Sequence, residues 1–433
     1  MKVLLLGLGR ANLPVAKYLM QRDDEVFLYE DSIETLSQSA KELINSGQIQ
    51  LHQDDNYDLV ITSPGVHPEK EIIKNMVAKN ISVIDEIEFT YSQLKNPRVI
   101  AVTGTNGKST TISLIGNILN SANFDNFIGG NISPGRPFSQ ALFLKPLDYY
   151  VLEISSFQLM RIKTFHPKIA VLTNITIDHL DWHEDFEEYK IAKSKIFANQ
   201  DENDFAVLNA DDENVFALAD KIKANIVFFG RKAKSGVHFD GDFFYGKERL
   251  FSVQNPALVG RHSVMNIAAA IVVAKILRIS NDKIDQALRN FKSLPHRLED
   301  IGKFHGVRYI NNSMCTNESA AIASFLAIEG EKIVIIGGKQ KGDAEQRYLN
   351  LLIKEAKACI ILGSNAQEIA TYFKSQKFRR FKIAENVDDA VKKAREFAES
   401  GDVILLNPGF ASFDYFRNFE ERGEAFKNAA YHD

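Results

Sequence analysis

Residues 101–111 have the sequence AVTGTNGKSTT, between the apolar run VIAVTG and the helical segment TTISLIGNILNSA. Gly104 and Gly107 let the backbone curl so that successive N–H groups point at phosphate oxygens. Lys108 can reach a terminal phosphate, and the Ser109 hydroxyl can bind Mg²⁺. The G-x-x-G-K-S spacing is two residues tighter than the usual form of this loop. A strand before it and a helix after it nevertheless predict a phosphate-binding loop in an α/β domain.

About a hundred residues precede this loop and show a βαβ pattern of their own. Gly7-Leu8-Gly9 lies where a strand turns into a helix, and Glu30 follows Gly9 by 21 residues, as in a dinucleotide-binding fingerprint. Asn12 occupies the place of the third glycine, so a merely tight turn remains an alternative. A backbone-lined pocket at a helix N-terminus suits a diphosphate. We therefore predict a nucleotide-diphosphate site here.

Further apolar strands follow the phosphate loop, and a third series of alternating strands and helices begins near LPHRLE (294–299). Near-continuous apolar strands suit sheets that are buried on both faces. We predict three consecutive α/β domains with mostly parallel sheets, in which Rossmann-like N- and C-terminal domains flank a central P-loop ATPase-like domain. The expected boundaries are 1–95 for the first domain, 96–295 for the central one and 296–433 for the last.

The length and composition of the chain exclude some classes of protein. A chain of 433 residues is too long for one core, and a net charge of −4 argues against a nucleic-acid surface. No window approaches eighteen apolar residues, so no membrane insertion is expected. The amino-terminal run MKVLLLGLG could pass as a signal peptide, but its glycines favour a buried strand. Cys315 and Cys359 have neither zinc nor redox-pair spacing, and we expect a monomer in a reducing cytoplasm.

Two other segments carry candidate metal ligands. Glu153 ends an apolar strand, and ligands bind at the carboxyl edge of a parallel sheet. Its carboxylate is therefore a candidate magnesium ligand, and a simple helix-capping group is the alternative interpretation. His179 and Asp181 lie in NITIDHLDWH and could also bind metal. Their spacing alone favours a polar loop that caps a helix.

Eight motifs in a fixed order resemble the Mur ligase family, the ATP-dependent amide ligases that build the peptide stem of bacterial cell-wall precursors. The resemblance covers nearly the full length, and the tight phosphate-loop spacing is the family's own form. The motifs are TGTNGKST (103–110), GGNI (129–132), EISSFQL (153–159), NITIDHLDWH (174–183), NADD (209–212), GRHSVMN (260–266), LPHRLE (294–299) and NPGFASFDYFRNFEERGEAF (407–426).

The resemblance implies a reaction in peptidoglycan precursor synthesis. The γ-phosphoryl group of ATP moves to the carboxylate of UDP-N-acetylmuramoyl-L-alanine, and the amine of glutamate attacks the acyl phosphate and expels phosphate. D-glutamate is the favoured substrate. Both steps accumulate negative charge, which Lys108 and two Mg²⁺ ions would stabilise. The first domain would hold UDP, the second ATP, and the third the incoming amino acid.

The resemblance also assigns residues to these roles. Lys193, in YKIAK, matches the lysine that the family carboxylates with CO₂ to a carbamate, an anionic ligand for a second Mg²⁺ beside His179. The catalytic residues would be Lys108, Glu153, His179 and Lys193, and the metal ligands Ser109, Glu153, His179 and carbamylated Lys193. The ATP site would comprise Gly104, Thr105, Asn106, Gly107, Lys108, Ser109, Thr110, Asn266 and Arg297. The UDP-substrate site would comprise Gly9, Arg10, Ala11, Glu30, Asp31, Gly65, Asn131 and His179. The amino-acid site would comprise Thr316, Lys341, Ser412 and Phe419.

The chain departs from the family pattern in its third segment. Glutamate-adding members usually have asparagine-aspartate-serine-lysine-alanine-threonine-asparagine where this chain has NNSMCTN (311–317). Met314 cannot pair with a carboxylate as the usual lysine does, so one charge-assisted contact is lost. Lys341 and Arg417 are the cations that could compensate. Ligation of L-glutamate or another acidic amino acid is therefore the first alternative.

Other classes fit less well. Folate polyglutamylating synthetases share the loop form but lack the amino-terminal βαβ segment. A non-catalytic nucleotide-binding subunit of the ligase-like type would carry a four-cysteine zinc insertion, which two cysteines cannot build. An oxidoreductase that uses a dinucleotide would leave the phosphate loop without a role.

Overall fold

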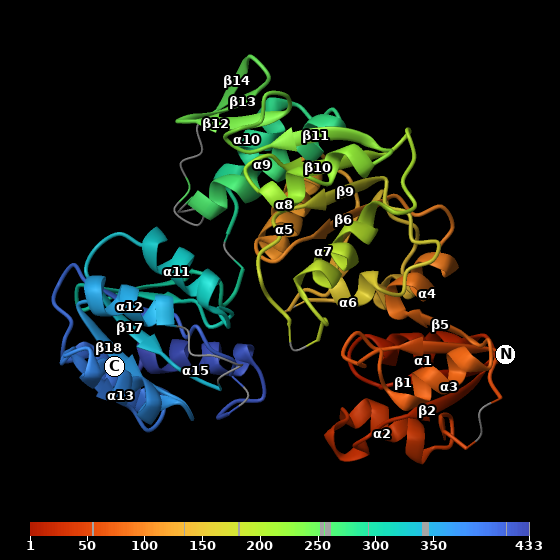
Figure 1. The fold of residues 1–433 in the computed structure, drawn as a ribbon, viewed down its shortest axis with the longest axis horizontal. Coiled ribbons are helices and arrows are strands. Elements are labelled where there is room, and N and C mark those ends of the chain that lie inside the picture. Colours follow the sequence, from red (N-terminus) through yellow and green to blue (C-terminus); the bar gives the residue numbers. More distant parts are fainter. Residues whose placement is uncertain are drawn as a thin grey trace. The chain divides into compact units, whose positions relative to one another are not determined.

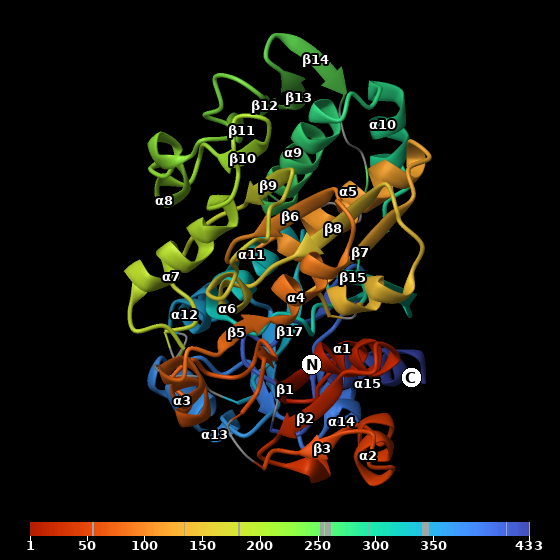
Figure 2. The same ribbon diagram turned by 90° about the vertical axis from the view of Figure 1, so that its right-hand side faces the viewer.

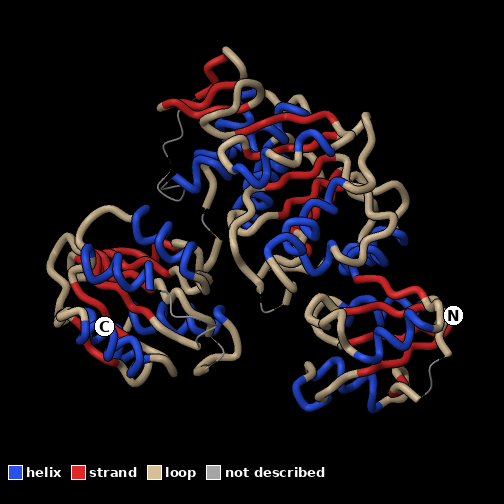
Figure 3. Tube along the Cα trace, in the orientation of Figure 1, coloured by secondary structure: helices blue, strands red, loops and turns tan. Residues whose placement is uncertain are grey.

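A computed structural model of the chain describes residues 1–53, 56–133, 135–180, 182–251, 255, 261–292, 294–339, 346–412 and 414–432, with the backbone alone at 261 and 262. The chain is α/β and its sheets are mostly parallel, as predicted (Figure 1, Figure 3). Two compact units form: Met1–Val253 with Met265–Leu288, and Gln254–Val264 with Arg289–Asp433. The first unit contains two sheets and the second contains one. The three predicted domain boundaries stay a prediction.

The amino-terminal sheet is parallel throughout, in the order β3-β2-β1-β4-β5. The strands are β1 Lys2–Leu6, β2 Glu25–Tyr29, β3 Gln50–Leu51, β4 Leu59–Thr62 and β5 Ser82–Asp85. The helices are α1 Asn12–Gln21, α2 Gln38–Asn45, α3 Glu71–Ala78 and α4 Glu86–Gln93, with a 3₁₀ turn η1 at Ile33–Thr35. The amino-terminal apolar run thus forms the buried central strand β1. The strand order reverses between β1 and β4, where ligands of such sheets bind.

The central sheet has nine strands, in the order β14-β13-β12-β11-β10-β9-β6-β8-β7. The parallel strands are β6 Val99–Thr103, β7 Asn126–Gly130, β8 Tyr149–Glu153, β9 Ile169–Leu172, β10 Phe205–Asn209 and β11 Asn225–Phe229. The edge strands β12 Val237–Asp240, β13 Asp242–Tyr245 and β14 Glu248–Phe251 form an antiparallel extension that the sequence analysis did not anticipate.

Helices cover both faces of the central sheet. Its helices are α5 Lys108–Ser121, α6 Ser156–Leu159, α7 Phe186–Ser194, α8 Glu213–Phe216, α9 Arg261–Ile276 and α10 Asn281–Arg289, with 3₁₀ turns η2 Phe138–Phe143, η3 Lys195–Phe197 and η4 Ala219–Lys221. Helix α5 lies beside α9 and α10, where Asn117 donates to the Ala287 carbonyl at 2.6 Å (Figure 2). Tyr189 of α7 belongs instead to the hydrophobic core that contains Val99 and Ala101 of β6.

The sheet of the second unit has the order β15-β16-β20-β17-β18-β19, and only β15 runs antiparallel to its neighbour. Its strands are β15 Glu299–Phe304, β16 Val307–Asn311, β17 Lys332–Ile336, β18 Ala358–Ile361, β19 Phe381–Ile383 and β20 Val403–Leu406. Its helices are α11 Glu318–Ala327, α12 Gln346–Glu355, α13 Ala366–Ser375, α14 Val387–Arg395 and α15 Phe419–Tyr431.

Hydrogen bonds join the two sheets of the first unit. The Glu88 carboxylate, 3% exposed, accepts from the backbone N–H groups of Lys163, Thr164 and Phe165 at 2.7–3.0 Å. Together with the Thr164 hydroxyl, which donates at 2.6 Å, these donors fix α4 against the segment that follows α6. Within the described residues, no helix is long and apolar enough to cross a membrane.

Candidate active site

The phosphate-binding loop connects β6 to α5. Gly104 and Gly107 have φ values of +144° and +86°. A Cβ atom would lie 2.0 Å from Thr173 Oγ1 at Gly104 and 2.2 Å from Asn266 Oδ1 at Gly107. Both positions therefore require glycine for two reasons, the backbone conformation and the close approach of a neighbouring side chain.

The end of β9 holds this loop in place. Asn106 N–H donates to Asn174 Oδ1 at 2.8 Å, and Asn174 Nδ2 donates back to the Asn106 carbonyl at 2.9 Å. Thr173 Oγ1 also donates to the Asn106 carbonyl, at 2.7 Å. Spacing gave no role to Thr173 or Asn174, although Asn174 begins the NITIDHLDWH motif and Thr173 precedes it.

Lys108 and Ser109 begin α5, whose N-terminal N–H groups create a positive potential. Lys108 Nζ donates to the carbonyls of Gly104 and Thr105, at 2.9 Å each, which fixes the ammonium group within the loop. Ser109 Oγ donates to Glu153 Oε2 at 2.6 Å. Glu153 ends β8 and is only 4% exposed. Two of the four predicted metal ligands thus meet beside the phosphate loop, and hard oxygen donors of this kind fit Mg²⁺.

Lys193 is buried, with 2% of its surface exposed, and its Nζ donates to the Gly104 carbonyl at 2.9 Å. The same nitrogen lies 4.5 Å from the centre of the Tyr189 ring. Burial, followed by the nearby Lys108 ammonium, holds the pKa of Lys193 well below its usual value. A buried amine with a lowered pKa carries a larger neutral, nucleophilic fraction at pH 7.

His179 and Asn131 approach the same region. The His179 ring lies 6.3 Å from that of Tyr189, so His179 and Lys193 both border one aromatic ring. Asn131 N–H donates to the Glu153 carbonyl at 2.8 Å. Asp178, which the sequence analysis did not single out, places its Oδ2 3.8 Å from His179 Nε2. Asp181 lies outside the described residues.

The other predicted ATP ligands divide between the two units. Thr105 Oγ1 lies 3.1 Å from the Tyr189 hydroxyl, and Thr110 is in the first turn of α5. Asn266 Oδ1 accepts from Thr111 Oγ1 at 3.4 Å, so this side chain lies against the loop. Arg297 belongs to the second unit, where its Nη2 lies 3.1 Å from Met314 Sδ.

The amino-terminal glycine loop is built differently from a three-glycine fingerprint. Gly7 has φ +80°, and the buried Asn12 amide donates to the carbonyls of Gly7, Leu6 and Ile61 at 2.9, 3.3 and 3.3 Å. Asn12 therefore ties the ends of β1 and β4 together, which explains an asparagine in place of glycine. Glu30 Oε2 accepts from the Leu8 N–H at 3.1 Å.

A cavity of about 790 Å³ opens beside this loop. Its lining residues are Leu8, Gly9, Arg10, Leu13, Pro14, Lys17, Glu30, Thr35, Leu36, Ser37, Gln140 and Phe143. Of the predicted UDP ligands, Gly9, Arg10 and Glu30 line it. Ala11 and Gly65 do not, and Asp31 pairs with Lys70. Such a cavity, apolar with a few cations, suits a small organic anion.

The second unit contains the predicted amino-acid ligands. Ser412 is buried, Phe419 is partly buried, and Thr316 lies partly exposed just before α11. The Phe419 carbonyl accepts from Ser313 Oγ at 2.7 Å. Lys341 lies outside the described residues. Arg417, the other candidate cation, is paired with Glu421 at 3.3 Å.

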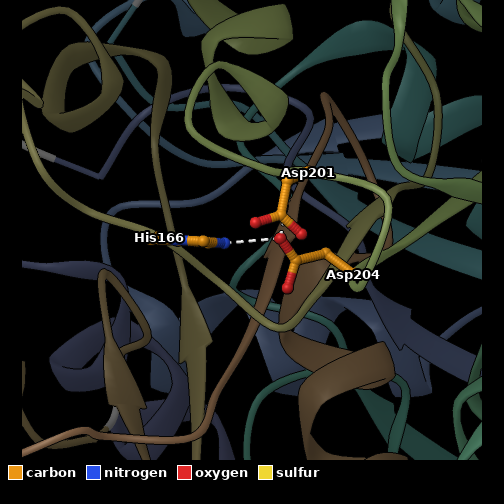
Figure 4. Close-up of side chains that lie close together, drawn as sticks. All are labelled: His166, Asp201 and Asp204. Carbon is orange, nitrogen blue, oxygen red and sulfur yellow. Dashed lines mark hydrogen bonds and ion pairs between the residues drawn. The ribbon is translucent and has the colours of Figure 1, made fainter.

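The described residues contain one group of three possible metal ligands: His166, Asp201 and Asp204 (Figure 4). Asp204 accepts from His166 Nε2, from Lys168 Nζ at 2.9 Å and from Asp201 N–H at 2.8 Å. Its oxygens are thus occupied by protein donors. His166 and Asp204 precede β9 and β10, whereas the phosphate loop follows β6, so this group lies at the opposite edge of the sheet and is structural.

Comparison with known proteins identifies the relatives of this chain. Residues 102–274 match the Mur ligase middle domain, and residues 296–410 match the Mur ligase glutamate ligase domain. A UDP-N-acetylmuramoylalanine–D-glutamate ligase of Pelotomaculum thermopropionicum is 38% identical over 443 residues, covering 98% of this chain and 96% of that protein. The Aquifex aeolicus enzyme of the same name is 35% identical over 429 residues, covering 99% and 98%.

Solved structures share the fold at lower identity. A UDP-N-acetylmuramate-alanine ligase from Thermotoga maritima aligns with a TM-score of 0.65 at 19% identity, covering 100% of this chain and 99% of that one. The MurF ligase of Thermotoga maritima in complex with ADP aligns with a TM-score of 0.62 at 20% identity, covering 87% and 90%. At these identities the likeness supports the architecture alone.

Proposed function

Because the chain belongs to the Mur ligase family, we propose that it joins D-glutamate to UDP-N-acetylmuramoyl-L-alanine at the expense of ATP. The main structural support for this proposal is a cluster of side chains at the carboxyl edge of the central sheet. There Lys108, the Ser109–Glu153 pair and Lys193 surround one glycine loop. Its relatives of the same length carry the name of this reaction. The product is a precursor of the bacterial cell wall.

The loop and Lys108 would bind and orient the ATP phosphates. The first turn of α5 would direct its backbone N–H groups at the phosphates, and the Lys108 ammonium adds a full positive charge. Magnesium, held by Ser109 and Glu153, would neutralise charge on the transferred phosphoryl group. In phosphoryl transfer, positioning and electrostatic stabilisation supply most of the rate enhancement, and these residues provide both.

We further propose that Lys193 is carboxylated. Its neutral amine would attack CO₂, a new N–C bond would form and one proton would leave to solvent, so that the side chain becomes an anionic carbamate. Two observations support this: the pKa of Lys193 is lowered by burial and by Lys108, and His179 borders the same Tyr189 ring. The carbamate and His179 would then hold a second Mg²⁺.

The amino acid would be selected in the third domain, by Thr316, Lys341, Ser412 and Phe419. Asn312 occupies the usual aspartate position, and its buried amide accepts from Leu298 N–H at 3.1 Å and donates to Asn407 Oδ1 at 2.8 Å. Met314 contacts Arg297 instead of offering a cation. L-glutamate or another acidic amino acid is the alternative that this difference favours. We also propose that the enzyme works as a monomer in the cytoplasm, with the domain boundaries 1–95, 96–295 and 296–433.

Phosphate release tests the assignment. Lys108→Ala should lower D-glutamate-dependent phosphate release by at least a hundredfold, since one charged contact in the transition state is lost. Lys190→Ala is the matched control, because Lys190 lies on α7, paired with Glu187 at 2.7 Å. Near-normal turnover of a folded Lys108→Ala variant would refute the phosphate-loop assignment.

A further inference from the structure

The 790 Å³ cavity is lined by segments that belong to both parts of the first unit, one part around each of its two sheets. Ten of its lining residues, between Leu8 and Ser37, belong to the amino-terminal part, whereas Gln140 and Phe143 belong to η2 of the central part. A segment more than a hundred residues away in sequence thus completes a cavity that the glycine loop begins. Nothing in the glycine-loop pattern indicates this second wall.

Hydrogen bonds hold η2 against the glycine loop. Ser139 N–H donates to the buried Glu86 carboxylate, and Ser139 Oγ donates to the Ala11 carbonyl at 2.7 Å. Phe138 and Ala141 are buried in the core of the central sheet, and Leu142 packs on the core of the amino-terminal sheet. Because these contacts join η2 to both parts of the first unit, the backbone of η2 is held beside the cavity by the fold itself.

The Phe143 ring and the Gln140 side-chain amide can both contact a ligand in this cavity. Phe143 is 43% exposed, and among the described residues its ring contact is an edge-on approach to Tyr18, with centroids 6.3 Å apart at 87°. The Gln140 side chain is exposed, and its amide makes no hydrogen bond with the described residues. A large aromatic side chain that lines a cavity with so much open surface offers a face for a flat ring.

The rest of the lining matches the other parts of a nucleotide. Arg10 and Lys17 bring positive charge to a cavity that opens beside the start of α1, which suits a diphosphate. Leu13, Pro14 and Leu36 supply apolar surface to the same cavity. A cavity lined by two cations, aliphatic side chains and an exposed aromatic ring suits a diphosphate joined to a heteroaromatic base.

We infer that Phe143 stacks on the uracil ring of the nucleotide substrate and that the Gln140 amide pairs with its edge. This inference rests on the proposed function, which supplies the uridine nucleotide. Uracil presents two carbonyl oxygens around an N–H, and a glutamine amide both donates and accepts, so the two edges are complementary. The central domain thereby takes part in reading the substrate that the first domain binds.

Calorimetric titration of UDP into the full chain tests this inference. Phe143→Ala should raise the Kd for UDP about tenfold or more, since base–aromatic stacking has this value when truncated to alanine. Phe143→Trp should stay within about threefold of wild type. Leu144→Ala is the matched control, because Leu144 is 42% exposed and adjacent but does not line the cavity, and its Kd should not change. The Kd for ATP should be the same in every variant.

The outcomes separate this inference from the proposed function. Failure of wild type to bind UDP overturns the function. Normal UDP binding by both Phe143→Ala and Gln140→Ala overturns the stacking inference and leaves the function standing. Should Phe143→Ala also lose ATP binding, the apolar but non-aromatic Phe143→Leu with 5-fluoro-UDP decides: the ¹⁹F resonance should shift upfield on binding to wild type, through the ring current of Phe143, and lose that shift in the variant. An unchanged shift contradicts the inference.

Discussion

Glu86 anchors η2 and is expected to make the stability of the first unit depend on pH. Its carboxylate is 1% exposed and accepts from Ser139 N–H. Burial is the main reason that the pKa of Glu86 rises from 4.5 to about 7, against the hydrogen bonds of Ser139 and the positive charge of Arg10. The neighbouring Asp85 carboxyl also faces it and has a pKa raised well above its usual value by burial and by Glu86.

The sign and size of the effect follow from proton linkage. Between pH 4.5 and about 7 the folded protein keeps a proton on Glu86 that the unfolded chain has released. The free energy of unfolding therefore falls as pH rises through this window, and the difference between the two pKa values corresponds to about 3 kcal/mol. Glu86→Gln removes the titration and keeps an oxygen that can accept from Ser139. Relative to wild type, the variant should gain about 3 kcal/mol between pH 4.5 and pH 8.

Urea unfolding at pH 5, 6, 7 and 8 measures this gain. Trp182 is the single tryptophan and lies in the same unit, so its fluorescence reports the unit that contains Glu86. Glu25→Gln, at an exposed carboxylate of this unit, is the control and should run parallel to wild type. A Glu86→Gln curve that also runs parallel to wild type would refute the reasoning, as would a gain that shrinks towards pH 8.

Three further substitutions test separate parts of the structure. Lys193→Ala should lower turnover at least a hundredfold and recover partly with formate or acetate in a phosphate-release assay; the absence of recovery would argue against the carbamate. Gly104→Ala should weaken ATP binding at least tenfold by calorimetry while UDP binding persists, because its Cβ would meet Thr173 Oγ1 at 2.0 Å. Asp204→Asn should cost about 1–3 kcal/mol in urea unfolding at pH 7. Burial raises the pKa of Asp204, but its hydrogen bonds to Asp201, His166 and Lys168 outweigh burial, and the net pKa is lowered. The stability cost of Asp204→Asn should therefore fade as pH drops through the pKa of Asp204. A pH-independent cost would contradict the ion-pair interpretation.

Local patterns predicted the parts of the site that are local in sequence. The glycines of the phosphate loop, Lys108 and Ser109 lie within six residues, so spacing alone identified them. Glu153 was predictable because the carboxyl ends of the strands in a parallel sheet form the edge where ligands bind. In the structure its Oε2 lies 2.6 Å from Ser109 Oγ. The α/β class followed in the same way from alternating strand and helix patterns.

Long-range packing accounts for what the sequence did not reveal. Without the family resemblance Lys193 would be read as an exposed helix lysine, whereas in the structure it is buried and its Nζ donates to the Gly104 carbonyl. The hydrogen bond between Ser139 and Ala11 joins residues 128 apart, and no periodicity encodes such a pairing. Asn174 likewise supports the phosphate loop from 68 residues away. Such contacts depend on the order of strands in the sheet, which motif spacing leaves open.

The dependence of ATP turnover on the two other substrates tests the central claim most directly. ADP and phosphate release are measured with UDP-N-acetylmuramoyl-L-alanine and D-glutamate together, with each omitted, and with L-glutamate in place of the D isomer. The proposed function predicts steady release only when the nucleotide substrate and D-glutamate are both present, with one amide product formed for each ADP. Steady release of ADP and phosphate when one of the two substrates is omitted would contradict the proposed function. Preferential formation of an amide with L-glutamate would contradict it too.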